Sequence, residues 1–139
     1  MMNRILAPIL LLVFLFPSLA LGEEVIFDDL VNREGIYYKK STDVLFTGKT
    51  TGQKQGTFKD GVLDGPWVRY YDNGRLRIKG EYKNGLRVGP WVEYYDNGQL
   101  KEKGDYKNGL REGPWVTYYE NGELVERFSG TYKNGVKVD

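Results

Sequence analysis

Residues 89–113 decide the fold of this chain, and they read G-P-W-V-E-Y-Y-D-N-G-Q-L-K-E-K-G-D-Y-K-N-G-L-R-E-G. The same pattern begins 24 residues earlier, at Gly65, and starts again where this stretch ends. Three tryptophans mark the period, because Trp67, Trp91 and Trp115 are 24 residues apart. Self-similarity at a fixed period of this length is the signature of a repeat architecture. The chain is therefore expected to be an array of similar units.

Each repeat contains two short turn signals, in which Asn or Asp is followed by Gly. Such a pair between β-prone runs is typical of a type I′ hairpin turn, because both central residues need a positive φ. A regular helix is disfavoured, because glycine recurs inside every segment. The sequence thus predicts strands joined by tight turns, at Asp60-Gly61, Asn73-Gly74, Asn84-Gly85, Asn97-Gly98, Asn108-Gly109, Asn121-Gly122 and Asn134-Gly135.

A two-residue turn at Asn97-Gly98 sets which residues face each other in its hairpin. It places Trp91 opposite Gly104 and Tyr95 opposite Leu100. A three-residue turn would move Leu100 to the other face, because a one-residue slip inverts every side chain. We expect each large ring to cover the glycine opposite it, a known way of filling a glycine site in a sheet. The residues expected to build this packing are Trp67, Gly80, Trp91, Gly104, Trp115 and Phe128, with Phe128 opposite Trp115 because the third repeat is two residues longer.

The other face is predicted to carry valine and tyrosine crossed by basic side chains. With the two-residue turn, Tyr70 faces Arg77 and Tyr94 faces Lys101. The basic stems can then lie over the rings and form cation–π contacts. Alternating charges are also the ordinary pattern of a solvent-facing sheet surface. The candidate interaction surface for an anionic partner comprises Tyr70, Arg77, Tyr94, Lys101, Lys103 and Tyr118.

Neither face is fully polar or fully apolar, which indicates one layer rather than a sandwich. The predicted fold is all-β: a single-layer antiparallel meander of stacked β-hairpin repeats, elongated and twisted. The face with tryptophan is expected to pack the sheet itself, since buried aromatics dominate small cores. The alternative is an aromatic surface for a glycan or a quaternary ammonium group.

The composition excludes several classes of protein. The 139 residues include no Cys and no His, which removes disulfides, thiolate nucleophiles and the commonest general base and metal ligand. The charges nearly balance, at 20 Lys and Arg against 19 Asp and Glu, whereas nucleic-acid binders show a basic excess. Calcium-loop and phosphate-loop spacings are absent. We expect no enzyme activity, no metal, no cofactor and no nucleic-acid partner.

Residues 1–22 have the pattern of a secretory signal peptide. Arg4 supplies the positive start, an apolar run follows to Phe16, and small residues then allow cleavage after Ala20 or Gly22. The apolar run is short for a spanning helix, although an uncleaved N-terminal anchor is the alternative. The protein is thus expected to be exported, periplasmic or secreted. Residues 23–55 depart from the period and are interpreted as an N-terminal capping hairpin region, with the repeats over residues 56–139.

Residues 89–109 resemble the MORN-repeat-variant family of bacteria through the pattern G-x-W-x-x-Y-Y-x-N-G-x-L-x-x-x-G-x-Y-K-N-G. The lead-in segments 35–38 and 46–49 are similar to members often labelled antitoxin components of toxin–antitoxin systems. The resemblance implies an elongated sheet of hairpins that serves as an interaction platform. Related repeats are linked to membrane lipids and to scaffolding.

These features predict a non-catalytic exported repeat protein that acts as a protein-interaction scaffold. One alternative is attachment to an envelope or host surface through anionic lipid, cell-surface glycan or choline-like groups. The other is an antitoxin-like component that neutralises a partner protein, which would act in the cytoplasm rather than outside it. The sequence leaves the oligomeric state and the identity of the partner open.

Overall fold

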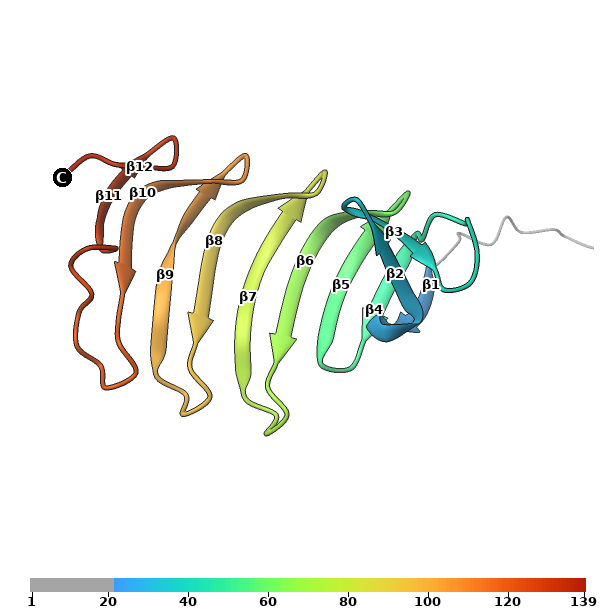
Figure 1. Ribbon diagram of the computed structural model, residues 1–139, viewed down its shortest axis with the longest axis horizontal. Helices are drawn as coiled ribbons and strands as arrows, with labels where there is room; N and C mark the ends of the chain where they lie inside the picture. The colour runs from blue at the N-terminus through green and yellow to red at the C-terminus, as the bar shows by residue number, and fades with distance from the viewer. Residues whose placement is uncertain (1–21) are drawn as a thin grey trace, which may run out of the picture.

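The computed structural model describes residues 22–139. The expected signal peptide, residues 1–22, lies outside the described part except for Gly22. The described residues form one open sheet of ten strands, with a separate two-stranded hairpin at the N-terminal end (Figure 1). The strands follow one another side by side in a single layer, which confirms the predicted all-β meander of hairpins.

The strands of the large sheet lie in the order β1-β4-β5-β6-β7-β8-β9-β10-β11-β12. Their bounds are β1 (Glu23–Ile26), β4 (Gly48–Thr51), β5 (Lys54–Lys59), β6 (Val62–Tyr70), β7 (Leu76–Lys83), β8 (Leu86–Tyr94), β9 (Leu100–Lys107), β10 (Leu110–Thr117), β11 (Gly130–Lys133) and β12 (Val136–Lys137). The small sheet pairs β2 (Leu30–Arg33) with β3 (Ile36–Lys39), and a single 3-10 turn covers Phe27–Asp29. One pairing departs from the predicted antiparallel pattern, because β1 lies parallel to β4.

The two kinds of turn in each repeat differ, although both contain Asn-Gly. At Asn84-Gly85 both residues have positive φ, 49° and 78°, as the predicted two-residue turn requires. At Asn73-Gly74 only the glycine does, at 81°. The Gly74 amide donates to the Tyr71 carbonyl at 2.9 Å, and the Tyr71 amide donates to the Arg75 carbonyl at 2.9 Å. The loop therefore has three residues, so the two-residue turn predicted here and at its equivalents is wrong.

A bulge next to each of the first two three-residue loops restores the predicted register in the middle of the hairpin. Tyr70 pairs with Leu76 but Arg69 pairs with Ile78, so that Arg77 is an extra residue. An extra residue in one strand shifts the pairing by one position, which offsets the shift made by the longer loop. Beyond the bulge Trp67 pairs with Gly80, as predicted.

The same bulge overturns the pairings predicted near the loop. Tyr94 stands opposite Leu100 rather than Lys101, and Tyr70 stands opposite Leu76 rather than Arg77. The basic residue occupies the bulge in both hairpins, and its side chain moves to the other face. Leu76 and Leu100 were predicted on the tryptophan face, and both lie on the other face, as a three-residue turn requires.

A second irregularity places each indole on a glycine. Lys79 pairs with Val92 and Glu81 with Val88, so Gly80 faces three residues, Gly-Pro-Trp, of the next hairpin. A Cβ built on Gly80 would lie 2.7 Å from Trp91 Nε1. Each indole therefore lies over a glycine of the preceding hairpin, which corrects the expectation that it covers its partner within the same hairpin. The pairs are Trp67 over Gly56, Trp91 over Gly80 and Trp115 over Gly104.

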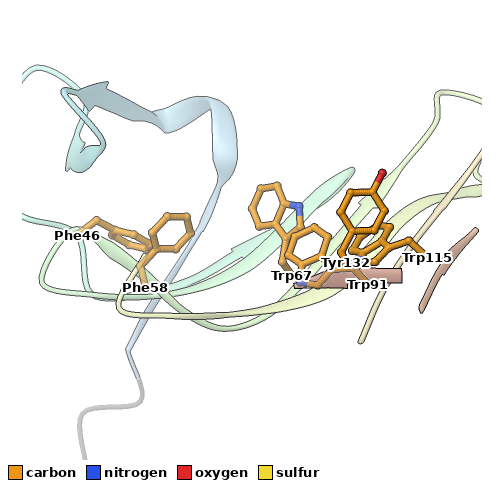
Figure 2. Close-up of a cluster of buried hydrophobic side chains, with 6 residues drawn as sticks. All are labelled: Phe46, Phe58, Trp67, Trp91, Trp115 and Tyr132. Atoms are coloured by element: carbon orange, nitrogen blue, oxygen red, sulfur yellow. The ribbon is translucent and has the colours of Figure 1, made fainter. Parts of the chain in front are cut away.

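The core is a row of rings along one side of the sheet. Figure 2 shows six buried rings, Phe46, Phe58, Trp67, Trp91, Trp115 and Tyr132. From Trp67 onwards, tryptophan and tyrosine alternate and meet edge to face, with ring centroids 4.9–6.5 Å apart. Such a pair adds about 0.5–1.5 kcal/mol beyond the area it buries. This row replaces the second layer that a single sheet lacks.

The N-terminal region covers one end of the row. The hairpin of β2 and β3 turns at Glu34-Gly35, and it lies across β4 and β5 in Figure 1. Phe27 contacts Trp67 with ring centroids 5.7 Å apart, and Tyr37 contacts Phe58 at 5.0 Å. Burial at this contact raises the pKa of the Tyr37 hydroxyl. Phe27 thus covers the ring of Trp67, the first indole that lies over a glycine, and Tyr37 covers Phe58 beside it.

At the other end, the longer third repeat does not place Phe128 as predicted. Trp115 pairs with Gly130, and Phe128 lies outside the strands with 47% of its surface exposed. The two additional residues are absorbed in the segment before β11, where Val125 is buried instead. The stem of Lys137 lies over Gly130, in the place that an indole takes in the repeats before it.

Candidate functional site

The sheet has two faces of different character. We name the first the aromatic face, since it carries the row Trp67, Tyr82, Trp91, Tyr106, Trp115 and Tyr132. We name the second the proline–tyrosine face, since the alternation along the strands places there Pro66, Val68, Tyr70, Lys79, Pro90, Val92, Tyr94, Leu100, Lys103 and Tyr118.

The rings of the aromatic face are not open to a ligand. Trp67, Trp91 and Trp115 are 9%, 6% and 2% exposed. The guanidinium of Arg111 lies over the Trp115 ring at 4.1 Å, and that of Arg87 lies over the Trp91 ring at 4.7 Å. The indole nitrogen of Trp115 donates to the Asp105 carbonyl at 3.0 Å. These contacts support the interpretation of the aromatic face as packing rather than as a glycan or choline site.

Two basic side chains on the aromatic face are paired with glutamates. Arg111 binds Glu102 at 2.6 Å, and Lys101 binds Glu93 at 3.0 Å. Partial burial lowers the pKa of Lys101, but the hydrogen bond and charge of Glu93 outweigh it, so the pKa is raised overall. The pKa of Arg111 is raised in the same way, since the Glu102 charge and nearby tyrosines outweigh burial. Arg87 on the same face forms no ion pair within residues 22–139 and donates instead to the Tyr106 hydroxyl at 3.0 Å.

The proline–tyrosine face contains a groove of about 540 Å³, a volume within the usual range for ligand sites. Its walls are mostly apolar, with Pro66, Pro90, Tyr94 and Leu100 contributing from three strands. The remaining lining is Lys79, Gly80, Glu81, Trp91, Val92 and Lys103. A half-open apolar groove with a few charged groups can hold a segment of another molecule by shape, apolar contact and ion pairing.

A row of side chains crosses the strands along this groove. Cross-strand pairs join Val68, Lys79, Val92, Lys103 and Val116 in that order. Lysine therefore recurs on every second strand of the row. Neither Lys79 nor Lys103 forms an ion pair with any carboxylate of residues 22–139. The groove thus holds two cations that form no ion pair within the described part of the chain, and Glu81 is the carboxylate that lines it with them.

The structure brings together only part of the predicted interaction surface. The alternation along the strands places Tyr70, Tyr94, Lys103 and Tyr118 on the proline–tyrosine face. Arg77 and Lys101 do not join them, because the bulge sends both to the aromatic face. There Lys101 Nζ lies 5.8 Å from the centroid of the Tyr95 ring, and Arg77 lies 5.3 Å from that of Tyr71.

Six residues of the groove were not predicted as site residues: Pro66, Lys79, Glu81, Pro90, Val92 and Leu100. The prolines carried a usable signal, since proline inside a strand is confined to edges and bulges. A bulge at Gly-Pro-Trp also explains why the groove forms there. The position of Leu100 had no local signal, because it follows from the choice between two turns that the same Asn-Gly pair allows.

Two negative findings apply to the part of the chain that the structure describes. Residues 22–139 contain no group of three or more acidic, His or Cys side chains placed to bind a metal ion. No helix within this range is long and apolar enough to cross a membrane.

Comparison with protein families matches three consecutive units to the MORN repeat variant, at residues 63–84, 87–108 and 111–134. Each unit contains a Gly-Pro-Trp motif and a three-residue loop, and ends at the asparagine of a two-residue turn. Residues 63–134 belong to the MORN repeat variant family. MORN repeats commonly bind proteins or membranes, and the family is generally non-catalytic. No curated protein matched the chain. In this chain the MORN units supply both the buried aromatic face and the groove on the proline–tyrosine face.

Proposed function

We propose that this protein is a non-catalytic interaction scaffold that binds another protein through the proline–tyrosine face. The observation that carries the proposal is the contrast between the two faces. On the aromatic face the tryptophan rings are buried, and Lys101 and Arg111 are each paired with a glutamate. The other face has an apolar groove with two lysines that form no ion pair within residues 22–139.

A non-catalytic role is part of the same proposal. The sequence has no His and no Cys, so the usual nucleophile–base pair cannot be assembled from them. A repeated β-sheet with one patterned face is a surface suited to binding, and MORN repeats commonly have that role. Attachment through buried indoles would require the aromatic face to open, which makes a glycan or choline role for those rings the weaker candidate.

We further propose that the protein acts outside the cytoplasm. The support is the charged start, apolar run and small residues within residues 1–22. Cell fractionation with N-terminal sequencing tests this step. A mature N-terminus at residue 21 or 23 in the exported fraction supports export. An intact Met1 in the cytosol overturns it and restores the antitoxin-like alternative.

Site-specific photo-cross-linking in cells tests the binding face. A photoreactive amino acid is placed at Lys79 or Tyr94 in the groove, and at the exposed Lys40 as the matched control. We expect a defined adduct with one protein from the two groove positions and none from position 40. Equal labelling at all three positions, or labelling of lipid only, contradicts the proposal.

A further inference from the structure

We propose that the groove on the proline–tyrosine face takes an extended acidic peptide segment of the partner, laid across the strands along the array. The segment has carboxylates three residues apart, with proline or leucine between them. This inference rests on the proposed scaffold function and names the chemistry of the partner at that site.

The first argument is charge. Lys79 and Lys103 both line the groove and form no ion pair within the described residues, whereas Lys101 and Arg111 on the other face are each paired with a glutamate. Glu81 is the one carboxylate in the groove lining, which leaves the lining with a net positive charge. An anionic segment supplies the missing counter-charge, and such complementarity governs specificity and the rate of association.

The second argument is spacing. Lys79 on β7 and Lys103 on β9 are separated by the one strand β8, and both pair with Val92. Strands are about 4.8 Å apart, so the two lysines are about 10 Å apart along the array. Residues i and i+3 of a polyproline II peptide are about 9 Å apart and lie on the same side, because this helix has three residues per turn. A carboxylate at every third position therefore meets both lysines in turn.

The third argument is the polarity of the walls. Pro90, Val92 and Tyr94 on β8 lie between the strands of the two lysines, and Leu100 on β9 also lines the groove. Apolar walls of this kind hold proline and leucine side chains, as in other aromatic-lined grooves that bind extended peptides. An acidic polysaccharide would need polar partners for its hydroxyls, and the lining contains no Asn, Gln, Asp, Ser or Thr. A bilayer would need these side chains to protrude, but they line a hollow.

The test uses the full chain and a fluorescent probe peptide of four Glu-Leu-Pro triplets, with binding followed by anisotropy. The control peptide has the same composition, with three glutamates together at one end and the fourth at the other end, so that no two of them are three residues apart. We expect saturable binding of the triplet peptide, weakened by added salt, and binding of the control peptide that is about threefold weaker or worse, since only one of its carboxylates can meet a lysine in register. Equal affinity for the two peptides overturns the spacing argument, and no binding of either overturns the proposal.

Two double variants of equal charge change locate the site. Lys79→Glu with Lys103→Glu should weaken binding of the triplet peptide about tenfold or more, because two attractive contacts become repulsive. Lys40→Glu with Lys133→Glu, at exposed positions outside the groove, should change it less than about twofold. Tryptophan fluorescence and circular dichroism show whether each variant is folded. Equal weakening by both variants overturns the assignment to the groove.

Competing ligands separate this inference from the wider proposal. Vesicles with anionic phosphatidylglycerol, and polygalacturonate as an acidic polysaccharide, are measured against both double variants. The inference is wrong if the triplet peptide does not bind, while the vesicles or the polygalacturonate bind the natural chain and lose this binding only in the variant Lys79→Glu with Lys103→Glu. If no peptide binds but Lys79 and Tyr94 still give a defined protein adduct in cells, the acidic-peptide chemistry fails and the scaffold function stands.

Discussion

A single methyl group added at Gly104 should unseat the indole of Trp115. The ideal Cβ at this position would lie 2.6 Å from Trp115 Cγ, and closer still to Cδ2 and Cε2. Ordinary contact between carbon atoms is about 3.5–4.0 Å, so the ring must move by about 1 Å. The ring has little room to move, because Trp115 is 2% exposed and the centroids of the Trp115 and Tyr106 rings are 4.9 Å apart.

The magnitude follows from three contributions. Overpacking costs about 1–3 kcal/mol, and losing the hydrogen bond from Trp115 Nε1 to the Asp105 carbonyl adds about 1 kcal/mol. Replacing glycine by alanine returns about 0.4–1 kcal/mol through the unfolded state, because Gly104 does not need a positive φ. The free energy of unfolding should therefore fall by about 2 kcal/mol, which lowers Tm by about 6–12 °C in a domain of this size.

The assay is urea denaturation of Gly104→Ala in three backgrounds: the natural chain, Trp115→Leu and Trp91→Leu. Removing the Trp115 ring should relieve most of the clash, so the cost of Gly104→Ala should fall by about 1 kcal/mol or more, as expected for residues in contact. The Trp91→Leu background is the matched control, because Trp91 only pairs with Gly104 across the hairpin. Relief in the Trp91→Leu background instead would show that each indole sits on its own hairpin partner and would refute the reasoning.

Three further predictions concern the loops, the turns and alkaline pH. Tyr95→Phe removes the hydroxyl that donates to a backbone carbonyl of the next repeat at 2.8 Å, and should lower the free energy of unfolding by about 0.5–1.5 kcal/mol. Tyr119→Phe is the control, because Tyr119 is 55% exposed, and it should have almost no effect in the same urea titration. Asn108→Ala places a methyl side chain at a φ of 49° and should cost about 1 kcal/mol, while Asn108→Gly should be nearly neutral; equal costs would contradict a left-handed turn. The pKa values of Lys101 and Tyr37 are raised above the ordinary 10.5 and 10.0, so the fold favours their protonated forms. The urea midpoint should therefore be steady up to about pH 9 and fall as the pH rises through these pKa values. A constant midpoint up to about pH 11 would contradict this prediction.

The candidate site was harder to predict than the fold, and Lys101 and Leu100 show why. Both lie beside an Asn-Gly pair that can close a two-residue or a three-residue loop. The choice decides on which face each side chain lies, so the two residues were assigned to the wrong faces. Tyr94, on the strand opposite the extra residue, and Lys103, beyond the bulge, were placed correctly. Local sequence is a weak guide wherever one residue of slippage changes the face.

The sequence by itself determined the repeat, the strands and the left-handed turns such as Asn84-Gly85. These features depend on short stretches of sequence, and the same residues recur in every repeat. It also determined which residues pair in the middle of each hairpin, such as Trp91 with Gly104. Only the tertiary structure decided that the Trp91 ring lies on Gly80 and that β1 joins the sheet in parallel. These features depend on contacts between different hairpins, and the energy of such packing is set by neighbours that no local pattern specifies.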